Sequence, residues 1–436
     1  MTLVRTSRTF DEAVRCRAVL VDAWLPRAAA RHPDRLAINA LTYGELLAEV
    51  DATARRLAGR GVRPFDHVGI ALSPGDGFCI ALHAVLRLGA VAVPVDVRLS
   101  ARERARVVEG TTAVVDGPVI GTPAAEARLR DRHDLDAPAI VVHTSGTSGA
   151  PTPVELTFGN WLWSALGSAV ALGLDPHERW LCALPLSHVG GLSIVMRSAI
   201  YGTTALVHER FDTERVLDAL MDDGATMVSL VPTTLHRLLD AGLRQPPTLR
   251  WALLGGAPAT NALQGRAAAA GVRVAPTYGL TEACSQVTTL GAPLFCTKVR
   301  IAGDGELLVS GPTVAPNAGP RIATGDLGEW GPDGALRILG RKADTIISGG
   351  ENVAPAEVEA VLEAHPDVFE AAVHGRAHPE WGEAVVATVV AEPDLEADEL
   401  RAWCAARLAS FKVPKEIAFT AALPRTASGK LVRRDL

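Results

Sequence analysis

Residues 67–96 read HVGIALSPGDGFCIALHAVLRLGAVAVPVD and alternate strand, helix and strand within one short stretch. The apolar runs HVGIALS and AVAVPVD each predict a buried strand. Between them, GFCIALHAVLRLG has apolar residues at helical spacing, and Gly89 is typical of a helix end. This order of elements predicts a parallel sheet with helices on its faces.

The same alternation continues through most of the chain. Residues 41–60 predict a helix that begins with Thr42 and Glu45 as a capping box. Residues 159–174 predict another helix, and further apolar runs predict buried strands. Those runs are AIVVHTS, RWLCALPL, GATMVSLVP, LRWALLGG and VRVAPTYG. Ligands bind at the carboxyl ends of parallel strands, so we expect the functional site there.

The pattern changes near residue 300, where TKVRIAGDGELLVSGPTV predicts short antiparallel strands joined by a tight Gly-Asp-Gly turn. After Gly340, two helical segments and two strands form a unit of their own. We therefore predict an α/β fold in two domains. Residues 1–341 would form a large N-terminal domain of parallel α/β subdomains with a small β region, and residues 342–436 a small α+β domain.

Composition excludes some classes of protein. The chain has 48% hydrophobic and 21% charged residues and a net charge of −6, which is typical of a globular protein without a nucleic-acid or membrane surface. Its longest apolar tract, residues 78–97, contains Arg87 and Pro94 and predicts a buried helix and strand rather than a membrane span. The cysteines show no CxxC spacing, so we expect a cytoplasmic protein with reduced thiols. Homo-oligomerisation stays open.

The segment HTSGTSGAPTPVELT, residues 143–157, has the composition of a phosphate-binding loop. Backbone N–H groups and hydroxyls in such a turn can bind phosphate oxygens. The loop follows a strand and precedes a helix, which is the right context. It lacks the GK[ST] ending of a Walker A loop, and a plain turn is the alternative.

A second segment, PTYGLTEACSQ, carries residues suited to nucleotide chemistry. Tyr278 could stack on a base, Thr281 could donate to a phosphate, and Glu282 could hold Mg²⁺ through oxygen. The alternative is a strand-to-helix turn in which Thr281 is the N-cap.

Two further segments lie nearer the C-terminus. Asp326 follows a glycine and could bind a ribose diol, although an Asx-turn is the alternative, and Arg341 could equally be a surface charge. The glycines Gly349 and Gly350 lead into a polar turn. In LPRTASGKLVRRDL, Lys430 is either a solvated charge or a lysine that a small domain carries into a distant site.

These four segments, in this order, resemble the adenylate-forming superfamily of acyl- and aryl-CoA synthetases, peptide-synthetase adenylation domains and luciferases. Three longer segments resemble the o-succinylbenzoate–CoA ligases of menaquinone biosynthesis: LTFGNWLWSALGSAVALGL, WLCALPLSHVGGLSIVMRSAIYG and GRKADTIISGGENVAPAEVEAVL. The resemblance implies an AMP-forming acid–thiol ligase that converts o-succinylbenzoate, ATP and CoA into o-succinylbenzoyl-CoA through an acyl-adenylate, with Mg²⁺ as cofactor. It also implies that the small C-terminal domain is mobile and rotates between the two steps.

The resemblance implies a role for each matched residue. Lys430 would bridge the carboxylate and the α-phosphate, Thr281 would donate to that phosphate, and Glu282 would bind Mg²⁺. His188 would close the pantetheine tunnel or the acyl pocket. The other matched residues are the loop for the β- and γ-phosphates (Thr144, Ser145, Gly146, Thr147, Ser148 and Gly149), the adenine enclosure (Gly255, Gly256, Ala257 and Tyr278), the ribose contacts (Asp326 and Arg341), the pantetheine-tunnel glycines (Gly349 and Gly350) and Thr277 in the acid pocket.

The second carboxylate of o-succinylbenzoate needs its own donors. Arg197, nine residues after His188, is the candidate, and a helix-surface arginine is the alternative. Three departures from the family pattern stand out. Thr152 replaces the lysine that usually follows the phosphate loop, Ala343 occupies the hinge position, and the segment between Glu282 and Thr324 is short.

Three rival functions remain open. The chain could act on another aryl or acyl acid, or it could load a carrier domain. It could also be a degenerate nucleotide-binding homologue, for which the missing loop lysine is the one positive sign.

Overall fold

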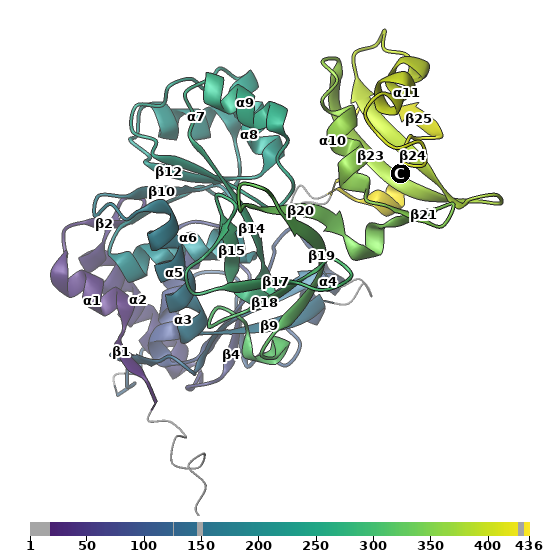
Figure 1. The fold of residues 1–436 in the computed structure, drawn as a ribbon. Coiled ribbons are helices and arrows are strands. Elements are labelled where there is room, and N and C mark those ends of the chain that lie inside the picture. The colour runs from purple at the N-terminus through teal and green to yellow at the C-terminus, as the bar shows by residue number, and fades with distance from the viewer. Residues whose placement is uncertain (1–17, 125, 146–150, 426–430) are drawn as a thin grey trace, which may run out of the picture.

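The structure is a computed structural model that describes residues 18–124, 126–145, 151–425 and 431–436. Figure 1 shows sheets with covering helices in the N-terminal part and a smaller sheet with its own helices at the C-terminal end. The central strands of the two large sheets are parallel, which confirms the predicted α/β fold.

The first large sheet contains the strand ends that matter for the site. Its central strands run parallel from β2 to β14, and β15 returns antiparallel to β14. In the described residues its order is β16 (Ala292–Pro293), β15 (Ser285–Thr289), β14 (Val274–Leu280), β13 (Trp251–Leu254), β12 (Met227–Leu230), β10 (Arg179–Cys182), β11 (Thr204–Val207), β2 (Leu36–Ile38) and β3 (Leu41–Thr42).

The second large sheet contains the stretch quoted first. The predicted strand–helix–strand unit forms as β4, α3 and β5, and Gly89 ends α3 in the left-handed conformation with φ 75°. The strand β9 lies at the sheet edge, which is where a proline such as Pro153 is tolerated, because it has no N–H to donate to a neighbouring strand. The order in the described residues is β6 (Ala113–Val115), β4 (His67–Ile70), β5 (Val91–Pro94), β8 (Pro138–Ser145) and β9 (Pro151–Thr157).

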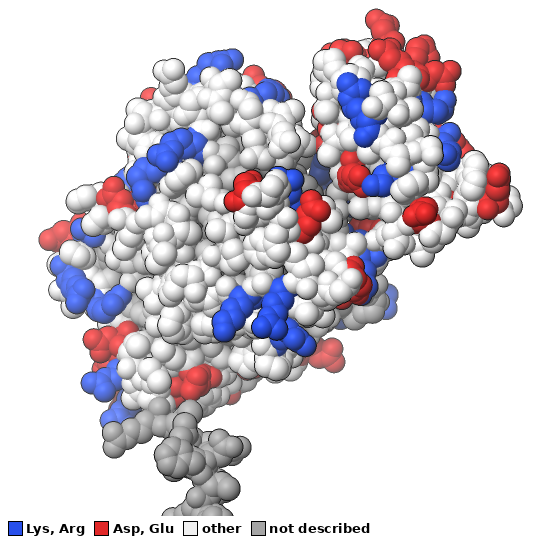
Figure 2. All heavy atoms as spheres, in the orientation of Figure 1, with Lys and Arg blue, Asp and Glu red and all other residues white. Residues whose placement is uncertain are grey.

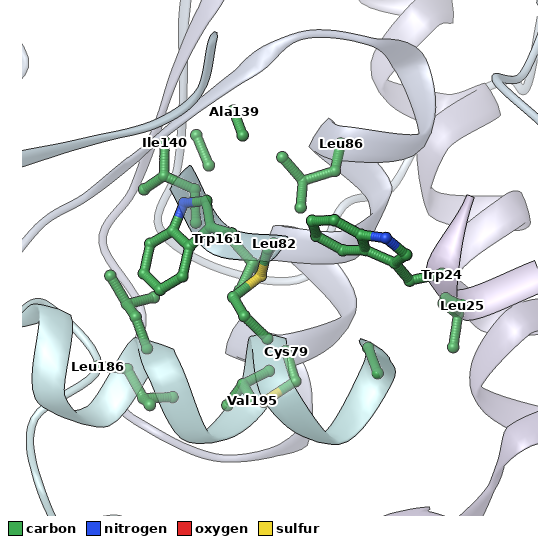
Figure 3. Packing of buried hydrophobic residues seen from close by; sticks show 14 of the residues in the cluster. Trp24, Leu25, Cys79, Leu82, Leu86, Ala139, Ile140, Trp161, Leu186 and Val195 are labelled. Atoms are coloured by element: carbon green, nitrogen blue, oxygen red, sulfur yellow. The ribbon is translucent and has the colours of Figure 1, made fainter. Parts of the chain in front are cut away.

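Helices packed between these sheets form the main core (Figure 3). Leu82 from α3 and Trp161 from α5 both belong to this cluster, and each is almost fully buried. The predicted capping box of Thr42 and Glu45 begins α2. The helices of this part are α1 (Trp24–Arg31), α2 (Tyr43–Gly59), α3 (Asp76–Leu88), α4 (Ala101–Val107), α5 (Phe158–Leu172), α6 (Val189–Tyr201), α7 (Thr213–Met221), α8 (Pro232–Asp240) and α9 (Asn261–Ala269).

A small antiparallel sheet follows, as the sequence predicts for the region near residue 300. Its first two strands pair Lys298 with Ser310 and Ile301 with Leu307 across the Gly-Asp-Gly turn. The order in the described residues is β17 (Lys298–Ile301), β18 (Glu306–Ser310), β19 (Ile322–Trp330) and β20 (Leu336–Arg341). This sheet brings Asp326 of β19 opposite Arg341 of β20.

The C-terminal region has a hydrophobic core of its own, which includes Ile346, Leu362, Val373 and Val385. That separate core suits the predicted division at residues 341 and 342, which stays a prediction. Figure 2 shows acidic side chains gathered at the end of this region that carries α11. Its elements are β21 (Ile346–Ser348), β22 (Glu351–Val353), α10 (Pro355–Leu362), β23 (Val368–His378), β24 (Gly382–Ala391), α11 (Ala397–Ala405) and β25 (Glu416–Phe419).

Short elements complete the fold. The strands β1 (Leu20–Asp22) and β7 (Arg132–Asp134) form a two-stranded sheet. Single turns of 3-10 helix are η1 (Thr281–Ala283), η2 (Pro316–Ala318), η3 (Lys342–Asp344) and η4 (Arg433–Asp435). Within the described parts of the chain, no helix combines the length and apolarity that a membrane crossing requires.

Candidate active site

The carboxyl ends of β13 and β14 lie against each other. A Cβ atom on Gly255 would stand 2.8 Å from Cγ2 of Thr277, so only glycine allows this approach. Gly256 follows with φ 80°, and its left-handed backbone turns the chain toward Ala257. The Thr277 hydroxyl donates to the backbone oxygen of Thr288 at 2.8 Å. The predicted adenine enclosure thus lies at a parallel-strand end.

Asp326 joins Tyr278 and Arg341 at the edge of this enclosure. The Tyr278 hydroxyl donates to Asp326 Oδ2 at 2.6 Å, and Arg341 Nε lies 2.7 Å from Asp326 Oδ1. Asp326 is buried, whereas the Arg341 side chain is 58% exposed. Burial and then the neighbouring Asp326 carboxylate raise the pKa of Tyr278, so its hydroxyl stays protonated as a donor. The alternative of an Asx-turn is wrong, because the Asp326 carboxylate contacts the Tyr278 hydroxyl and the Arg341 side chain and not the described backbone of its own turn.

The turn before Asp326 is held by side chains. The Asp326 N–H donates to the Thr324 hydroxyl at 3.0 Å, and Gly325 adopts φ 71°. The Gly325 N–H donates to Glu306 Oε1 at 3.0 Å, and Lys342 Nζ lies 3.0 Å from Glu306 Oε2. One carboxylate therefore contacts both the predicted ribose-binding turn and the segment that leads into the C-terminal region.

Thr281 and Glu282 lie in η1, directly after β14. Leu280 is the N-cap residue of this turn, so the alternative that makes Thr281 an N-cap is wrong. The Glu282 backbone oxygen accepts from the Ala315 N–H at 2.8 Å, which fixes the turn. Its half-buried carboxylate makes no hydrogen bond or ion pair with any residue that the structure describes.

The Glu282 carboxylate, which has no partner among the described residues, fits a magnesium ion bound mainly by phosphates. The described ranges contain no cluster of three or more acidic, histidine or cysteine side chains that could hold a metal. Magnesium in nucleotide sites usually takes one or two carboxylates and completes its shell with phosphate oxygens and water. The donor set on the protein is therefore sufficient for Mg²⁺ that arrives with a nucleotide.

The flanks of the predicted phosphate loop form a hairpin. Thr144 and Thr152 pair across β8 and β9, and the Thr144 hydroxyl donates to the Thr152 oxygen at 3.3 Å. Asn317 in η2 donates to the Pro153 oxygen at 3.1 Å. Ser145 ends β8. The remaining residues of that loop prediction, Gly146, Thr147, Ser148 and Gly149, lie outside the described residues, as does Lys430.

His188 is the N-cap residue of α6, and it lies near an acidic side chain that sequence reasoning missed. Its Nε2 atom is 3.9 Å from Oδ2 of Asp96, which also accepts from the Ser187 hydroxyl at 3.2 Å. Burial alone would raise the pKa of Asp96, but hydrogen bonds from Arg98 outweigh burial and lower it to about 2. A carboxylate directly after the parallel strand β5 was the available signal.

Arg197 is 1% exposed, so the alternative of a helix-surface arginine is wrong. Its Nη2 donates to the Ser164 hydroxyl at 3.2 Å, and its guanidinium lies over the Trp180 ring at 5.5 Å. Nε and Nη1 have no hydrogen-bond partner in the part of the chain that the structure describes. Burial lowers the pKa of Arg197. The Ser164 hydroxyl donates in turn to the backbone oxygen of Cys284 at 2.6 Å, just after η1.

The C-terminal region contributes two further features. Gly349 and Gly350 form the exposed turn between β21 and β22, with φ 61° and 84°. Arg433 donates to the Val373 oxygen at 3.1 Å, and it pairs with Glu359 at 2.6 Å and Asp344 at 3.3 Å. Arg433 therefore fastens the described C-terminal peptide to β23, α10 and η3.

The chain matches the family of AMP-binding enzymes over most of its length. The family model for AMP-binding enzymes matches residues 25–127 and 116–317, and the model for their C-terminal domain matches residues 357–430. The chain belongs to this family, so the predicted superfamily is confirmed.

Within the family, the relatives of this chain include 2-succinylbenzoate–CoA ligases, as the sequence predicted. The protein of that name from Bacillus licheniformis is 38% identical over 95% of this chain and 98% of its own. A solved o-succinylbenzoate CoA synthetase from Bacillus subtilis, in complex with its acyl-adenylate intermediate, has a TM-score of 0.87 at 35% identity. That match covers 95% of this chain and 98% of the other. The same enzyme with ATP and a magnesium ion has a TM-score of 0.87, at 35% identity over 96% and 100% of the two chains.

Proposed function

We propose that this chain is an ATP-dependent acid–thiol ligase that converts o-succinylbenzoate to o-succinylbenzoyl-CoA, a step of menaquinone biosynthesis. In the first half-reaction, a carboxylate oxygen of the acid attacks the α-phosphorus of ATP and expels pyrophosphate. In the second, the CoA thiol loses its proton and attacks the acyl carbonyl, and AMP leaves. The family match and the names of the relatives support this reaction type.

The first half-reaction brings an anion onto a polyanion, so the site must supply donors and cations. We assign the ribose to Asp326 and Arg341, and the adenine to Tyr278 and the glycine turn that begins at Gly255. Residues 144–149 would bind the β- and γ-phosphates through backbone N–H groups. Mg²⁺, when bound at Glu282, would neutralise charge on the phosphates. Thr281 would donate to the α-phosphate, and Lys430 would bridge it to the carboxylate.

One observation carries the choice of acid: the buried, unbalanced charge of Arg197. Removing a charge from water is costly unless a partner compensates it, and no described acidic side chain pairs with this guanidinium. o-Succinylbenzoate has two carboxylates, of which only one reacts. The second would supply the missing partner for Nε and Nη1. Thr277 and His188 would line the rest of the acid pocket.

For the second half-reaction, we propose that residues 342–436 rotate about the segment around Ala343. Gly349 and Gly350 would then line the pantetheine tunnel, where the absence of side chains leaves room for a thin chain. Their left-handed backbone conformations suit a turn that glycine alone adopts without strain. His188 would close the tunnel while the adenylate forms.

The test is a coupled assay of the purified protein with ATP, Mg²⁺ and CoA. o-Succinylbenzoate would be compared with benzoate and with a medium-chain fatty acid, and AMP and acyl-CoA would be followed. We expect turnover only with o-succinylbenzoate. Turnover confined to another acid would keep the ligase and overturn the pathway. ATP binding without AMP from any acid would favour a degenerate nucleotide-binding protein, with Thr152 in place of the loop lysine as the cause.

A further inference from the structure

We propose that the Tyr278 hydroxyl is a positioning group for nucleotide binding: it holds the Asp326 carboxylate so that its free lone pairs face the ribose. This inference rests on the proposed function only in taking the nucleotide to be ATP. It assigns Tyr278 a second role besides stacking on adenine, and the two roles reside in different atoms of one side chain.

The backbone aims both side chains at each other. The pairing of β14 with β15 shifts register between Tyr278 and Gly279, where Val287 of β15 is left without a partner in the register. A second irregularity follows Asp326, between Leu327 and Gly328. Bulges redirect the side chains beside them. Tyr278 comes from the large sheet and Asp326 from the small one, so their 2.6 Å hydrogen bond also joins two sheets.

The carboxylate has capacity left for a diol. Each ionised oxygen has two lone-pair positions, and Tyr278 and Arg341 each take one. One position per oxygen therefore stays available for the 2′- and 3′-hydroxyls. The terminal torsion of aspartate has broad minima, so a carboxylate held at one oxygen only could turn its remaining lone pairs away.

Tyr278 fixes the orientation of the Asp326 carboxylate more firmly than Arg341 does. The Arg341 side chain is 58% exposed, so water competes for its ion pair with Asp326. The Tyr278 ring is half-buried and packs beside the cluster of Ala283, Val287 and Val314. Removing its hydroxyl keeps the ring, and thus the stacking surface, while it releases one carboxylate oxygen.

The experiment measures binding of Mg–ATP, Mg–2′-deoxyATP and Mg–3′-deoxyATP to the full chain by calorimetry, without any acid. Wild-type protein and Tyr278→Phe would be compared. We expect Tyr278→Phe to weaken ATP binding about tenfold, as loss of a hydrogen bond to a charged group does. The deoxy nucleotides lack a ribose donor, so we expect the substitution to weaken their binding only about twofold relative to wild type.

Tyr43→Phe is the matched control. Its buried hydroxyl donates to the backbone oxygens of Ser198 and Thr203, away from the nucleotide residues. We expect it to leave the ATP affinity unchanged. An equal loss for all three nucleotides in Tyr278→Phe, or no loss for any, would overturn the positioning role. Because no acid is present, either result is independent of whether o-succinylbenzoate is the substrate.

Discussion

Arg197 and Arg250 differ in whether the protein supplies their counter-charge. Arg250 pairs with Glu178, whose side chain is 3% exposed, at 2.5 Å. Among the residues that the structure describes, Arg197 has the Ser164 hydroxyl and the Trp180 ring as partners and no acidic side chain. A buried charge without a partner lowers the stability of the fold, and removing one partner of an ion pair leaves the other charge uncompensated. The two residues should therefore respond in opposite ways to replacement.

We expect Arg197→Met to leave the free energy of unfolding within about 1 kcal/mol of wild type or to raise it, because a buried unpaired charge is removed. Arg250→Met should lower it by about 3 kcal/mol, since buried Glu178 then loses its partner. Urea unfolding of both variants measures this. Arg197→Met should also raise the KM for the acid far more than the KM for ATP. Equal effects on both constants would contradict the acid-binding role.

The proposed role of Lys430 concerns only the first half-reaction. We expect Lys430→Ala to abolish adenylate formation, because no other group would bridge the carboxylate and the α-phosphate. Thioester formation from supplied acyl-adenylate should largely remain. Pyrophosphate release and acyl-CoA formation would be measured separately, with the exposed Lys298→Ala as control. Equal loss of both half-reactions would refute the assigned role.

Residue types were easier to predict than residue contacts. Tyr278, Asp326 and Arg341 could each be singled out from their local segments, because glycine and threonine neighbours mark a strand end. Their mutual hydrogen bonds could not, since Tyr278 and Asp326 come from different sheets. The burial of Arg197 could not be predicted either. It depends on how α5 and β15 pack against α6, and the sequence of α6 alone does not show this.

At the scale of elements, the turn from β14 to β15 depends on one close backbone approach. A Cβ atom on Gly279 would stand 1.8 Å from the Ser285 backbone oxygen. No side-chain rotation can relieve such a contact. The bulge beside Tyr278 therefore requires glycine for space.

We expect Gly279→Ala to lower the free energy of unfolding by about 3 kcal/mol or more and to abolish ATP binding, because the bulge must open. Gly265→Ala is the matched control, since that glycine lies exposed on α9 with no atom within 4 Å of an added Cβ. It should raise the free energy of unfolding by about 0.5–1 kcal/mol through helix propensity. Thermal unfolding and ATP titration check both variants, and an unperturbed Gly279→Ala protein would contradict the account.

Elements with strong local signals formed as predicted. The capping box began α2, and Gly89 ended α3. The 3-10 turn η1 was not predicted, because three residues are too few for a periodic pattern. The register shifts between β14 and β15 and between β19 and β20 were not predicted for another reason. They arise from pairing between strands, and the sequence shows only a glycine beside each shift, Gly279 and Gly328.

At the scale of the whole molecule, buried histidines make stability depend on pH. Burial lowers the pKa of His83 to about 4 and that of His133 to about 3, from an ordinary 6.5. Below pH 6.5 the two histidines therefore bind protons in the unfolded chain but stay neutral in the folded chain. The free energy of unfolding consequently decreases as the pH is lowered. Burial raises the pKa of Glu363 to about 7, which acts in the opposite direction between pH 4.5 and 7.

We expect each of the two histidines to remove about 1.4 kcal/mol of unfolding free energy per pH unit between pH 6.5 and 4.5. His83→Met should halve the slope that these two histidines contribute, whatever it does to stability at pH 7, because the other titrating groups are common to both proteins. Urea unfolding at several pH values measures the slopes. Identical slopes for wild type and variant would show that His83 is not held neutral.

The overall architecture was predictable because β-α-β order constrains topology, and right-handed parallel connections leave few arrangements. The strand order of the large sheet was not. β10 lies between β11 and β12, and β2 from the beginning of the chain joins the same sheet. Such order depends on long-range packing that no local pattern encodes.

The three contacts of Arg433 determine how residues 431–436 are held against the rest of the C-terminal region. They fasten residues 431–436 to β23, α10 and η3, so this peptide is part of the C-terminal body rather than a free tail. A group attached to a rigid body meets its target at an effective concentration that the body's geometry sets. A chemical group within residues 431–436 therefore moves only when the whole C-terminal sheet moves.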